Sequence, residues 1–582
     1  MTYANVRYKN AGNDEGDVLN FFNNQLRNLV QKNGGDNTFS IVSEHCHDKD
    51  VEVPMNTKTK LKLSHSAHSI SQIEKGFISM TLFLKLQMNN RFNDGDIINC
   101  DKDNIIFVGF KDAVEVISDA QFWVDGKLID GYNQSEMIKE SFAYNSIRSA
   151  DAKKGAPHSH SLWESVQCMS PNVCGVYIPL KKFADKKEVK VNMELIIPFT
   201  DQLALQAWRL YPNRILGEIE EEVKFSTEGL VWCQLQPQTV AEINKFWDPD
   251  PTKFNGAPFV PITNHFTQID SEAIIVHKCS QTDNANGPAA GKYAISIVPR
   301  GTAAGAQEYY QYELGINQLQ VKEAKVTKCL TNCAGFGIKP DVMEGILQGL
   351  QQPIIIPAQE LSKFQFESRA SNNSLTMSKS IPLRNATNIT MMFPFNSNDC
   401  TVFPNVMYEQ VRLTVNKKMY PETEFDNTWD GRFVEYQLQA NELDELEPTK
   451  EYLESISNPQ TGVGPEDDPH YGKRRLFDPF DNTSFGINFQ LERGNSGYVF
   501  DGIDTGSHAI TIEFKGTPKF RDGKTNPYLY PALKINGNSL AVNDAERETP
   551  LPEMWVCSDT YWTWSVEDGV RYYQRGIPAG YD

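Results

Sequence analysis

The sequence predicts an all-β protein built from two large β domains, and three observations support this class. Asp-Gly and Asn-Gly pairs, which reach positive φ at low cost and favour tight hairpins, recur from Asn33-Gly34 to Asp568-Gly569. Short runs between these turns alternate apolar and polar residues with the period of two that is typical of half-buried strands. Helical periodicity is confined to a few segments, which favours sandwiches or barrels over a parallel α/β fold.

The first element along the chain is a predicted amphipathic helix over residues 17–32. Its apolar residues recur with the helical period and share one side: Val18, Leu19, Phe21, Phe22, Leu26, Leu29 and Val30. Such a helix either docks on its own domain or packs on a neighbouring subunit. We assign residues 1–59 to an N-terminal arm that carries this helix.

The predicted strands follow, with two interruptions. Alternating runs at 78–86, 189–197 and 507–514 each predict a strand with one buried face. Residues 341–352, between Pro340 and Pro353, predict a short connecting helix. Residues 441–468 hold nine acids and one lysine, which predicts an exposed acidic insertion between strands.

A weak internal repeat suggests that one strand-turn unit is used twice. Residues 122–131 and 413–421 each form a β-run that closes in Val-(Asp/Asn)-X-Lys-(Leu/Met) before a Gly or Pro. The two segments lie near the middle of each half of the chain. We therefore expect a first β domain with long loop insertions over residues 60–340 and a second over 353–582, with the seam between Cys333 and Pro353.

Composition restricts the possible functions. The chain has 582 residues, 40% of them hydrophobic and 23% charged, which is a globular composition. Its net charge of −19 argues against a protein that coats nucleic acid through its whole surface, while a local basic face stays open. It has no apolar run long enough for a membrane span and no apolar stretch near the N-terminus, so neither a span nor a secretory signal is expected. The ten irregularly spaced cysteines are expected to be free thiols in a reducing compartment.

Catalytic and metal-binding motifs are incomplete. The Asp-Thr-Gly-Ser sequence at 504–507 has no second copy to form an aspartic-protease dyad, so a hairpin turn is expected. The glycine-rich stretch at 516–525 has the wrong spacing for a phosphate loop. The densest set of possible metal ligands matches no zinc pattern and predicts inter-strand histidines: His45, Cys46, His47, His65 and His68.

Two further groups have structural explanations. The four carboxylates within residues 218–222 are expected on a solvated or subunit-facing strand edge. The aromatic residues 555–564 are expected in a core or subunit interface, because no basic surface accompanies them for nucleic-acid stacking. We therefore predict a structural protein rather than an enzyme, with no catalytic residues, no cofactor and no metal.

Several short motifs resemble those of one viral family. VNMELIIPFTDQLAL at 191–205, followed by NRIL at 213–216, is similar to a stretch of double jelly-roll major capsid proteins. MMFPF at 391–395, CTVFPN at 400–405 and KMYP at 418–421 resemble the second barrel of capsid proteins from virophages, Polinton-like viruses and adintoviruses. In this resemblance, IIIP at 354–357 begins the second barrel, and the likeness covers roughly residues 60–582.

The resemblance implies a fold and a role. The fold would be two eight-stranded jelly rolls side by side, as in hexon-like proteins. Three chains would form a pseudo-hexameric homotrimer that tiles an icosahedral capsid around a DNA genome, with long loops, such as residues 248–305 and 441–468, on the outer surface. Neighbouring capsomers, penton proteins and minor capsid proteins would be partners, with no sequence-specific nucleic-acid binding. The protein would be assembled inside the host cell and located in the virion.

Two alternatives remain open at the level of sequence. One is a double-barrel scaffold protein that shapes an immature virion and is later discarded. The other is a β-sandwich carbohydrate-binding or glycan-processing protein, which would require a carboxylate pair in an aromatic-lined cleft.

Overall fold

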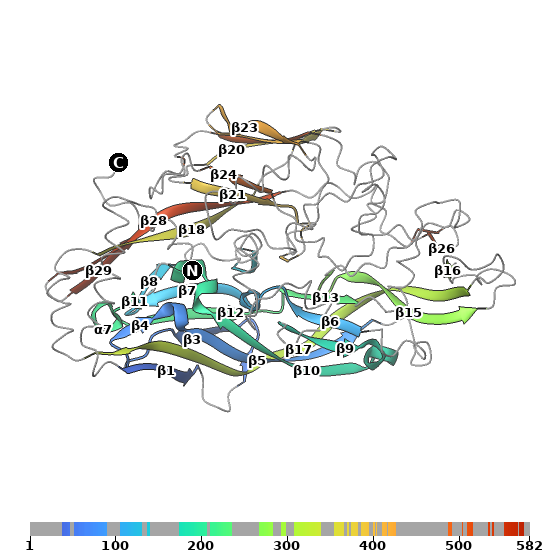
Figure 1. Cartoon of the computed structure of the whole chain (residues 1–582), viewed down its shortest axis with the longest axis horizontal. Helices are drawn as coiled ribbons and strands as arrows, with labels where there is room; N and C mark the ends of the chain where they lie inside the picture. Colours follow the sequence, from blue (N-terminus) through green and yellow to red (C-terminus); the bar gives the residue numbers. More distant parts are fainter. Residues whose placement is uncertain are drawn as a thin grey trace.

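The computed structural model of the chain is dominated by antiparallel strands (Figure 1). It describes residues 38–46, 52–89, 105–130, 137–139, 174–206, 210–234, 267–282, 293–297, 308–338, 354–365, 369–371, 374–381, 386–394, 400–401, 403, 410–415, 417–426, 487–491, 503, 509–515, 534–535, 538–539, 552–567 and 570–575. The predicted helices at 17–32 and 341–352 and the acidic insertion at 441–468 lie outside these residues. No described helix is long and apolar enough to cross a membrane.

The first barrel is formed by two facing sheets from the N-terminal part of the chain. One sheet contains β1 (Thr38–His45), β2 (Val53–Pro54), β17 (Glu308–Gly337), β5 (Phe77–Met88) and β10 (Glu188–Pro198). The other contains β3 (Lys58–Lys62), β12 (Ile219–Phe225), β7 (Ile117–Val124) and β8 (Lys127–Asp130).

The order of these strands is that of a jelly roll. We count β1 and β2 together as the first of eight positions, followed by β3, β5, β7, β8, β10, β12 and β17. One sheet then reads 1-8-3-6 and the other reads 2-7-4-5. This order results when a long antiparallel hairpin folds over on itself, so that the first and last strands pair within one sheet.

The second barrel repeats this order. Its first sheet is β18 (Ile354–Gln365), β28 (Glu553–Glu567), β21 (Ala386–Met392) and β24 (Ile487–Gln490), again 1-8-3-6. Its second sheet is β19 (Arg369–Ser371) and β20 (Ser374–Ser380), β25 (Ala509–Lys515), β22 (Gln410–Val415) and β23 (Lys418–Asp426), again 2-7-4-5. The protein is therefore all-β, with two jelly rolls in one chain.

Further strands extend the barrel sheets or form separate sheets. The additional strands are β4 (Ile70–Gln72), β6 (Ile105–Phe110), β9 (Gly175–Pro179), β11 (Leu210–Tyr211), β13 (Leu230–Gln234), β14 (Thr267–Gln268), β15 (Glu272–Thr282), β16 (Tyr293–Ile297), β26 (Lys534–Ile535), β27 (Asn538–Ser539) and β29 (Val570–Arg575). The separate sheets among the described residues are β14-β13-β6-β9 and β26-β27. The helical turns are η1 (Ile73–Lys75), η3 (Ala113–Val116), η4 (Leu180–Lys186), η5 (Phe199–Asp201), α6 (Leu203–Gln206) and α7 (Asn213–Leu216).

The core of the first barrel follows from the alternation of its strands. In β5, the buried residues Ile78, Met80, Leu82, Leu84, Leu86 and Met88 alternate with half-buried ones along the whole strand. Since successive strand side chains point to opposite faces, this pattern places one apolar row inside the barrel. The predicted strands at 78–86, 189–197 and 507–514 correspond to β5, β10 and β25, so these three predictions are confirmed.

The internal repeat is also a structural repeat. Residues 122–131 span the β7–β8 hairpin and residues 413–421 span the β22–β23 hairpin. Both hairpins join the fourth and fifth strand positions of their barrels. The short shared pattern therefore marks the same topological element twice.

The sequence boundaries differ from the structure in two places. Residues 38–59, which we assigned to the N-terminal arm, contribute β1, β2 and the start of β3 to the first barrel, because β1 and β2 pair with β17. The stretch 248–305, expected as a long loop, contains β14, β15 and β16, and the latter two pair with the N-terminal part of β17. β17 ends at Gly337 and β18 begins at Ile354.

Candidate functional site

The contact between the two barrels contains a buried ion pair. Lys139 lies in a helical turn that follows β8, and Glu553 is the first residue of β28 in the second barrel. Lys139 Nζ lies 3.0 Å from Glu553 Oε1, and the two side chains are only 4% and 5% exposed. A buried charge is costly unless it is paired and hydrogen-bonded, so the pair favours one arrangement of the two segments.

A second lysine shares this carboxylate. Lys363 Nζ of β18 lies 3.1 Å from Glu553 Oε1, and the ammonium also lies 5.8 Å from the centre of the Trp555 ring. Two cations on one anion leave local positive charge, which the aromatic face of Trp555 partly compensates. The sequence motifs did not single out Lys139, Lys363 or Glu553, because no short spacing connects residues that are hundreds of positions apart.

Other contacts join the same two halves of the chain. The Cys400 N–H donates to Oε1 of Gln268 at 3.0 Å, and the Cys400 thiol donates to the Glu228 carbonyl at 3.0 Å. Helix α6 of the first barrel also packs against β18 of the second. Figure 1 accordingly draws β18 and β28 on the side of the second barrel that is nearer to the first.

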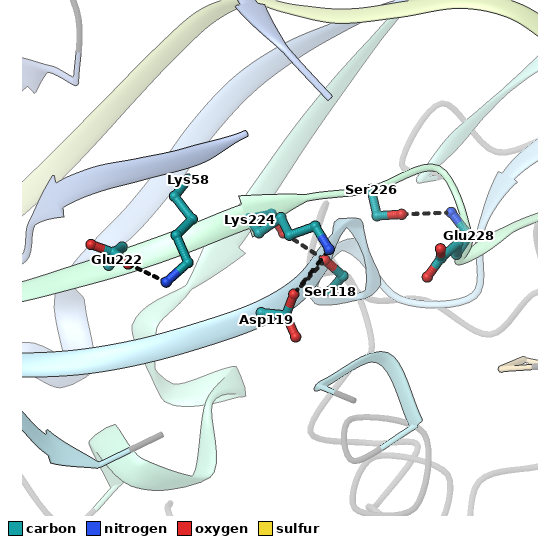
Figure 2. Close-up of polar contacts among 7 residues, drawn as sticks. All are labelled: Lys58, Ser118, Asp119, Glu222, Lys224, Ser226 and Glu228. Carbon is teal, nitrogen blue, oxygen red and sulfur yellow. Dashed lines mark hydrogen bonds and ion pairs between the residues drawn. The ribbon is translucent and has the colours of Figure 1, made fainter. Parts of the chain in front are cut away.

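The outer face of the β3–β12–β7 sheet presents charges of both signs. Lys58 of β3 pairs with Glu222 of β12 at 2.6 Å, and Lys224 of β12 pairs with Asp119 of β7 at 3.3 Å. Figure 2 shows these cross-strand pairs, together with the bond that the Glu228 N–H donates to Ser226 Oγ in the following turn. Alternating cross-strand ion pairs keep an outer sheet face polar, and each exposed pair contributes little to stability.

Glu221 departs from the expectation for residues 218–222. We expected these carboxylates at a solvated or subunit-facing edge, but β12 lies between β3 and β7, so the edge prediction is wrong. Alternation turns Glu220 and Glu222 outward and Glu221 inward, where it is 0% exposed. Burial raises the pKa of Glu221 to about 8, and the neighbouring Gln202 amide opposes the shift.

The histidine and cysteine candidates lie around the start of the first barrel. His65 and His68 are 5.9 Å apart between ring centres, and His68 Nε2 is 2.9 Å from Ser40 Oγ. Burial, followed by the charge of His65, lowers the pKa of His68. Among the described residues, no three His, Cys, Asp or Glu side chains form a group that could hold a metal ion. His47 lies outside them.

The remaining motif candidates fall partly outside the structure. The Asp-Thr-Gly-Ser sequence at 504–507 and the glycine-rich stretch at 516–525 lie outside the described residues. In the aromatic segment 555–564, Trp555 is buried at 3% exposure within a cluster that also contains Leu361, Met392, Phe403 and Cys557. For this residue the predicted core position is confirmed.

Comparisons with known proteins give structural likenesses only. No protein-family model matches the chain, and no curated protein matches it. The mavirus major capsid protein is similar at a TM-score of 0.41 and 9% identity, over 92% of this chain and 90% of that one. The Faustovirus major capsid protein is similar at 0.39 and 8%, over 94% and 98%. A chain of the Sputnik virophage is similar at 0.38 and 10%, over 93% and 89%.

Proposed function

We propose that this protein is a major capsid protein whose two jelly rolls act as one rigid building block of a viral shell. The observation that carries this proposal is the repeated strand order: both halves of the chain read 1-8-3-6 and 2-7-4-5. A chain with two barrels of equal topology presents two similar flanks to its neighbours. Three such chains supply six barrels, which suits a pseudo-hexameric homotrimer.

The physical properties of the barrels support this role. Two facing sheets pair most strand edges internally, which protects a protein that must reach high concentration before assembly from edge-to-edge aggregation. The buried contact between Lys139 and Glu553 opposes rotation of one barrel relative to the other. A building block that tiles a closed shell requires a constant angle between its two barrels.

The charge of the chain indicates how it would meet the genome. A net charge of −19 repels phosphate groups, so the protein would enclose DNA without condensing it.

The same proposal includes assembly of the trimers into an icosahedral shell, contacts with neighbouring capsomers, penton proteins and minor capsid proteins, and a location in the virion. Residues 1–37, which precede β1, would serve as an arm beneath the shell.

The oligomeric state tests this proposal directly. We expect size-exclusion chromatography with light scattering to give three times the chain mass of 65.8 kDa, and negative-stain images to show hexagonal particles or shells. A stable monomer that cleaves or binds sugars would contradict the proposal and favour a glycan-processing protein. Trimers that are absent from purified virions but present in immature particles would identify a scaffold protein instead.

A variant at the barrel contact tests the role of rigidity. Glu553→Leu removes the anion that Lys139 and Lys363 share, and we expect a loss of about 3–5 kcal/mol with fewer assembled trimers. The double variant Lys139→Met/Glu553→Leu should recover part of both losses, since it removes the buried cation as well. Glu222→Gln, at the exposed Lys58 pair, is the matched control and should cost about 0–1 kcal/mol. Unchanged stability and assembly in Glu553→Leu would contradict the proposed role of the pair.

A further inference from the structure

Two cysteines face each other where the first strand of the first barrel ends. β1 pairs with β17 from Thr38 opposite Gly337 to His45 opposite Leu330. The same register places Cys46 opposite Cys329, and the Cys46 N–H donates to the Cys329 carbonyl at 3.1 Å. Directly opposed, hydrogen-bonded residues of antiparallel strands have Cα atoms about 5.5 Å apart, within the range of about 4.4–6.8 Å that a disulfide spans.

The two side chains lie on the same face of the sheet. Cys329 belongs to the core of the first barrel, and Cys46 packs against that core. Both are free thiols, with Cys46 half-buried and Cys329 buried. The pKa of Cys329 is raised, first by a hydrogen bond with the Cys46 thiol, then by burial and by the charges of Cys46 and Glu221. The opposed register and the shared core thus make the two thiols neighbours on one face of the sheet.

A covalent link at this point would act on a weakly held strand. From residue 39 to residue 46, every residue is exposed or half-buried, and Phe39 and Ile41 are 49% and 51% exposed. Beyond its ladder with β17, β1 has a few polar contacts: the Ser43 hydroxyl donates to Asn332, the Thr331 hydroxyl donates to the Glu44 carbonyl at 3.4 Å, and Ser40 contacts His68. The half-exposed Phe39 ring also packs against Phe336, with 5.4 Å between the ring centres. A strand with so little buried surface opens readily.

We propose that Cys46 and Cys329 form a disulfide under oxidising conditions and thereby lock β1 onto β17. The oxidant is a low-molecular-weight disulfide such as oxidised glutathione. The Cys46 thiolate attacks one of its sulfurs, forming a mixed disulfide and releasing one glutathione thiolate, which takes up the proton lost by Cys46. Cys329 then loses its proton and attacks the Cys46 sulfur, releasing the second glutathione. The protein loses two hydrogens and the oxidant becomes two thiols.

The position of the pair determines the kinetics. Half-buried Cys46 is the thiol that the oxidant reaches, whereas Cys329 acts only from within the barrel. Once Cys46 carries glutathione, burial still raises the pKa of Cys329 and keeps this thiol protonated at neutral pH, so the second step is slow and accelerates as the pH rises. The lock would therefore form gradually after the protein leaves a reducing compartment, and it does not depend on the proposed capsid function.

Peptide mapping of the full chain tests the proposal. The protein is incubated with oxidised glutathione, its remaining thiols are alkylated, and a non-reducing digest is analysed by mass spectrometry. We expect a peptide containing Cys46 joined to one containing Cys329, which separates on reduction. Cys46→Ser should abolish this product. Cys333→Ser, a buried cysteine of the same strand that lies opposite Val42, should leave it intact.

Hydrogen exchange provides an independent measurement. Amide exchange in residues 38–45 should slow by at least about tenfold on oxidation of the wild type, with no change in Cys46→Ser. The proposal is overturned if Cys46 remains a free thiol, if it stops at the mixed disulfide with glutathione, or if it pairs with another cysteine. It is equally overturned if the expected link forms without slowing exchange in β1.

Discussion

The two barrels place different residues at one equivalent inward position. In the first barrel, Glu221 of β12 lies opposite Phe122 of β7, whereas in the second, Ile512 of β25 lies opposite Leu413 of β22. The repeated hairpins align Phe122 with Leu413, so Glu221 and Ile512 occupy the same place in the seventh strand. Both are 0% exposed. One barrel therefore keeps a carboxyl group where the other has an aliphatic side chain.

The difference shows that topology does not dictate the chemistry of each core position. Strand pairing itself is independent of the side chain at this position, since the ladder is formed by backbone hydrogen bonds, and the register decides only which side chains face inward. A polar side chain inside the barrel loses its contact with water, which costs free energy. Glu221 reduces this cost by remaining protonated beside Gln202. Ile512 carries no such cost. The first barrel thus has a pH-sensitive core position where the second has isoleucine.

Introducing a carboxyl group into the second barrel is the strongest test. We expect Ile512→Glu to lose more than about 4 kcal/mol at pH 8, because Ile512 is fully buried and its neighbours across the sheet, Met377 and Leu413, are apolar. Thermal unfolding followed by tryptophan fluorescence measures the loss. If the variant does not fold at pH 8, recovery of folded protein at pH 5, where the new glutamate is protonated, keeps the test decisive. A loss below about 1 kcal/mol at pH 8 would contradict the comparison.

Removing the carboxyl group from the first barrel is the converse test. The pKa of Glu221 is about 8 in the folded protein against 4.5 in the reference state, so only the unfolded chain ionises as the pH rises between these values. Wild-type stability is therefore lost progressively over this range, and the loss is complete above pH 8. At about 1.4 kcal/mol per pKa unit, Glu221→Gln should gain several kcal/mol over the wild type at pH 8 and almost nothing at pH 4.

The control for this test lies on the same strand. Glu220→Gln alters an outward carboxylate that lies 3.9 Å from Lys60, so its stability difference from the wild type should vary little with pH. Urea unfolding at a series of pH values measures both variants. Equal pH dependence in Glu221→Gln and the wild type would show that Glu221 is ionised in the folded protein.

The repeated hairpins differ in a smaller way. Gly126 adopts φ +74°, which is easy for glycine, whereas Lys417 adopts φ +63°, which strains a residue with a Cβ. A Cβ at Gly126 meets nothing within 4 Å, so Gly126→Ala should lose about 1 kcal/mol through backbone strain alone.

Lys417→Gly should gain less than about 1 kcal/mol, because glycine relieves the strain but also gives the unfolded chain more freedom. Differential scanning calorimetry of both variants measures the contrast. A loss in Lys417→Gly larger than that in Gly126→Ala would mean that the Lys417 side chain contributes contacts that outweigh the strain.

Local patterns predicted much of this fold because they report on neighbouring residues. Alternation located β5, β10 and β25, and the shared Val-(Asp/Asn)-X-Lys motif located the equivalent hairpins. The same patterns misplaced Glu221, since alternation distinguishes the two faces of a strand but not an edge strand from a central one. They also assigned β1 to an arm, because a short strand with exposed apolar residues has no strong local signal.

The sequence by itself determined the all-β class, the two-domain division and the hairpin used twice, because these depend on turn residues and on periods of a few positions. Only the tertiary structure decided the strand order, the burial of Glu221, the ion pair of Lys139 with Glu553 and the meeting of Cys46 with Cys329. Each of these features depends on contacts between residues that are far apart in the chain. Such pairs form because closing the sheets brings their strands together, and no local pattern records which strands will become neighbours.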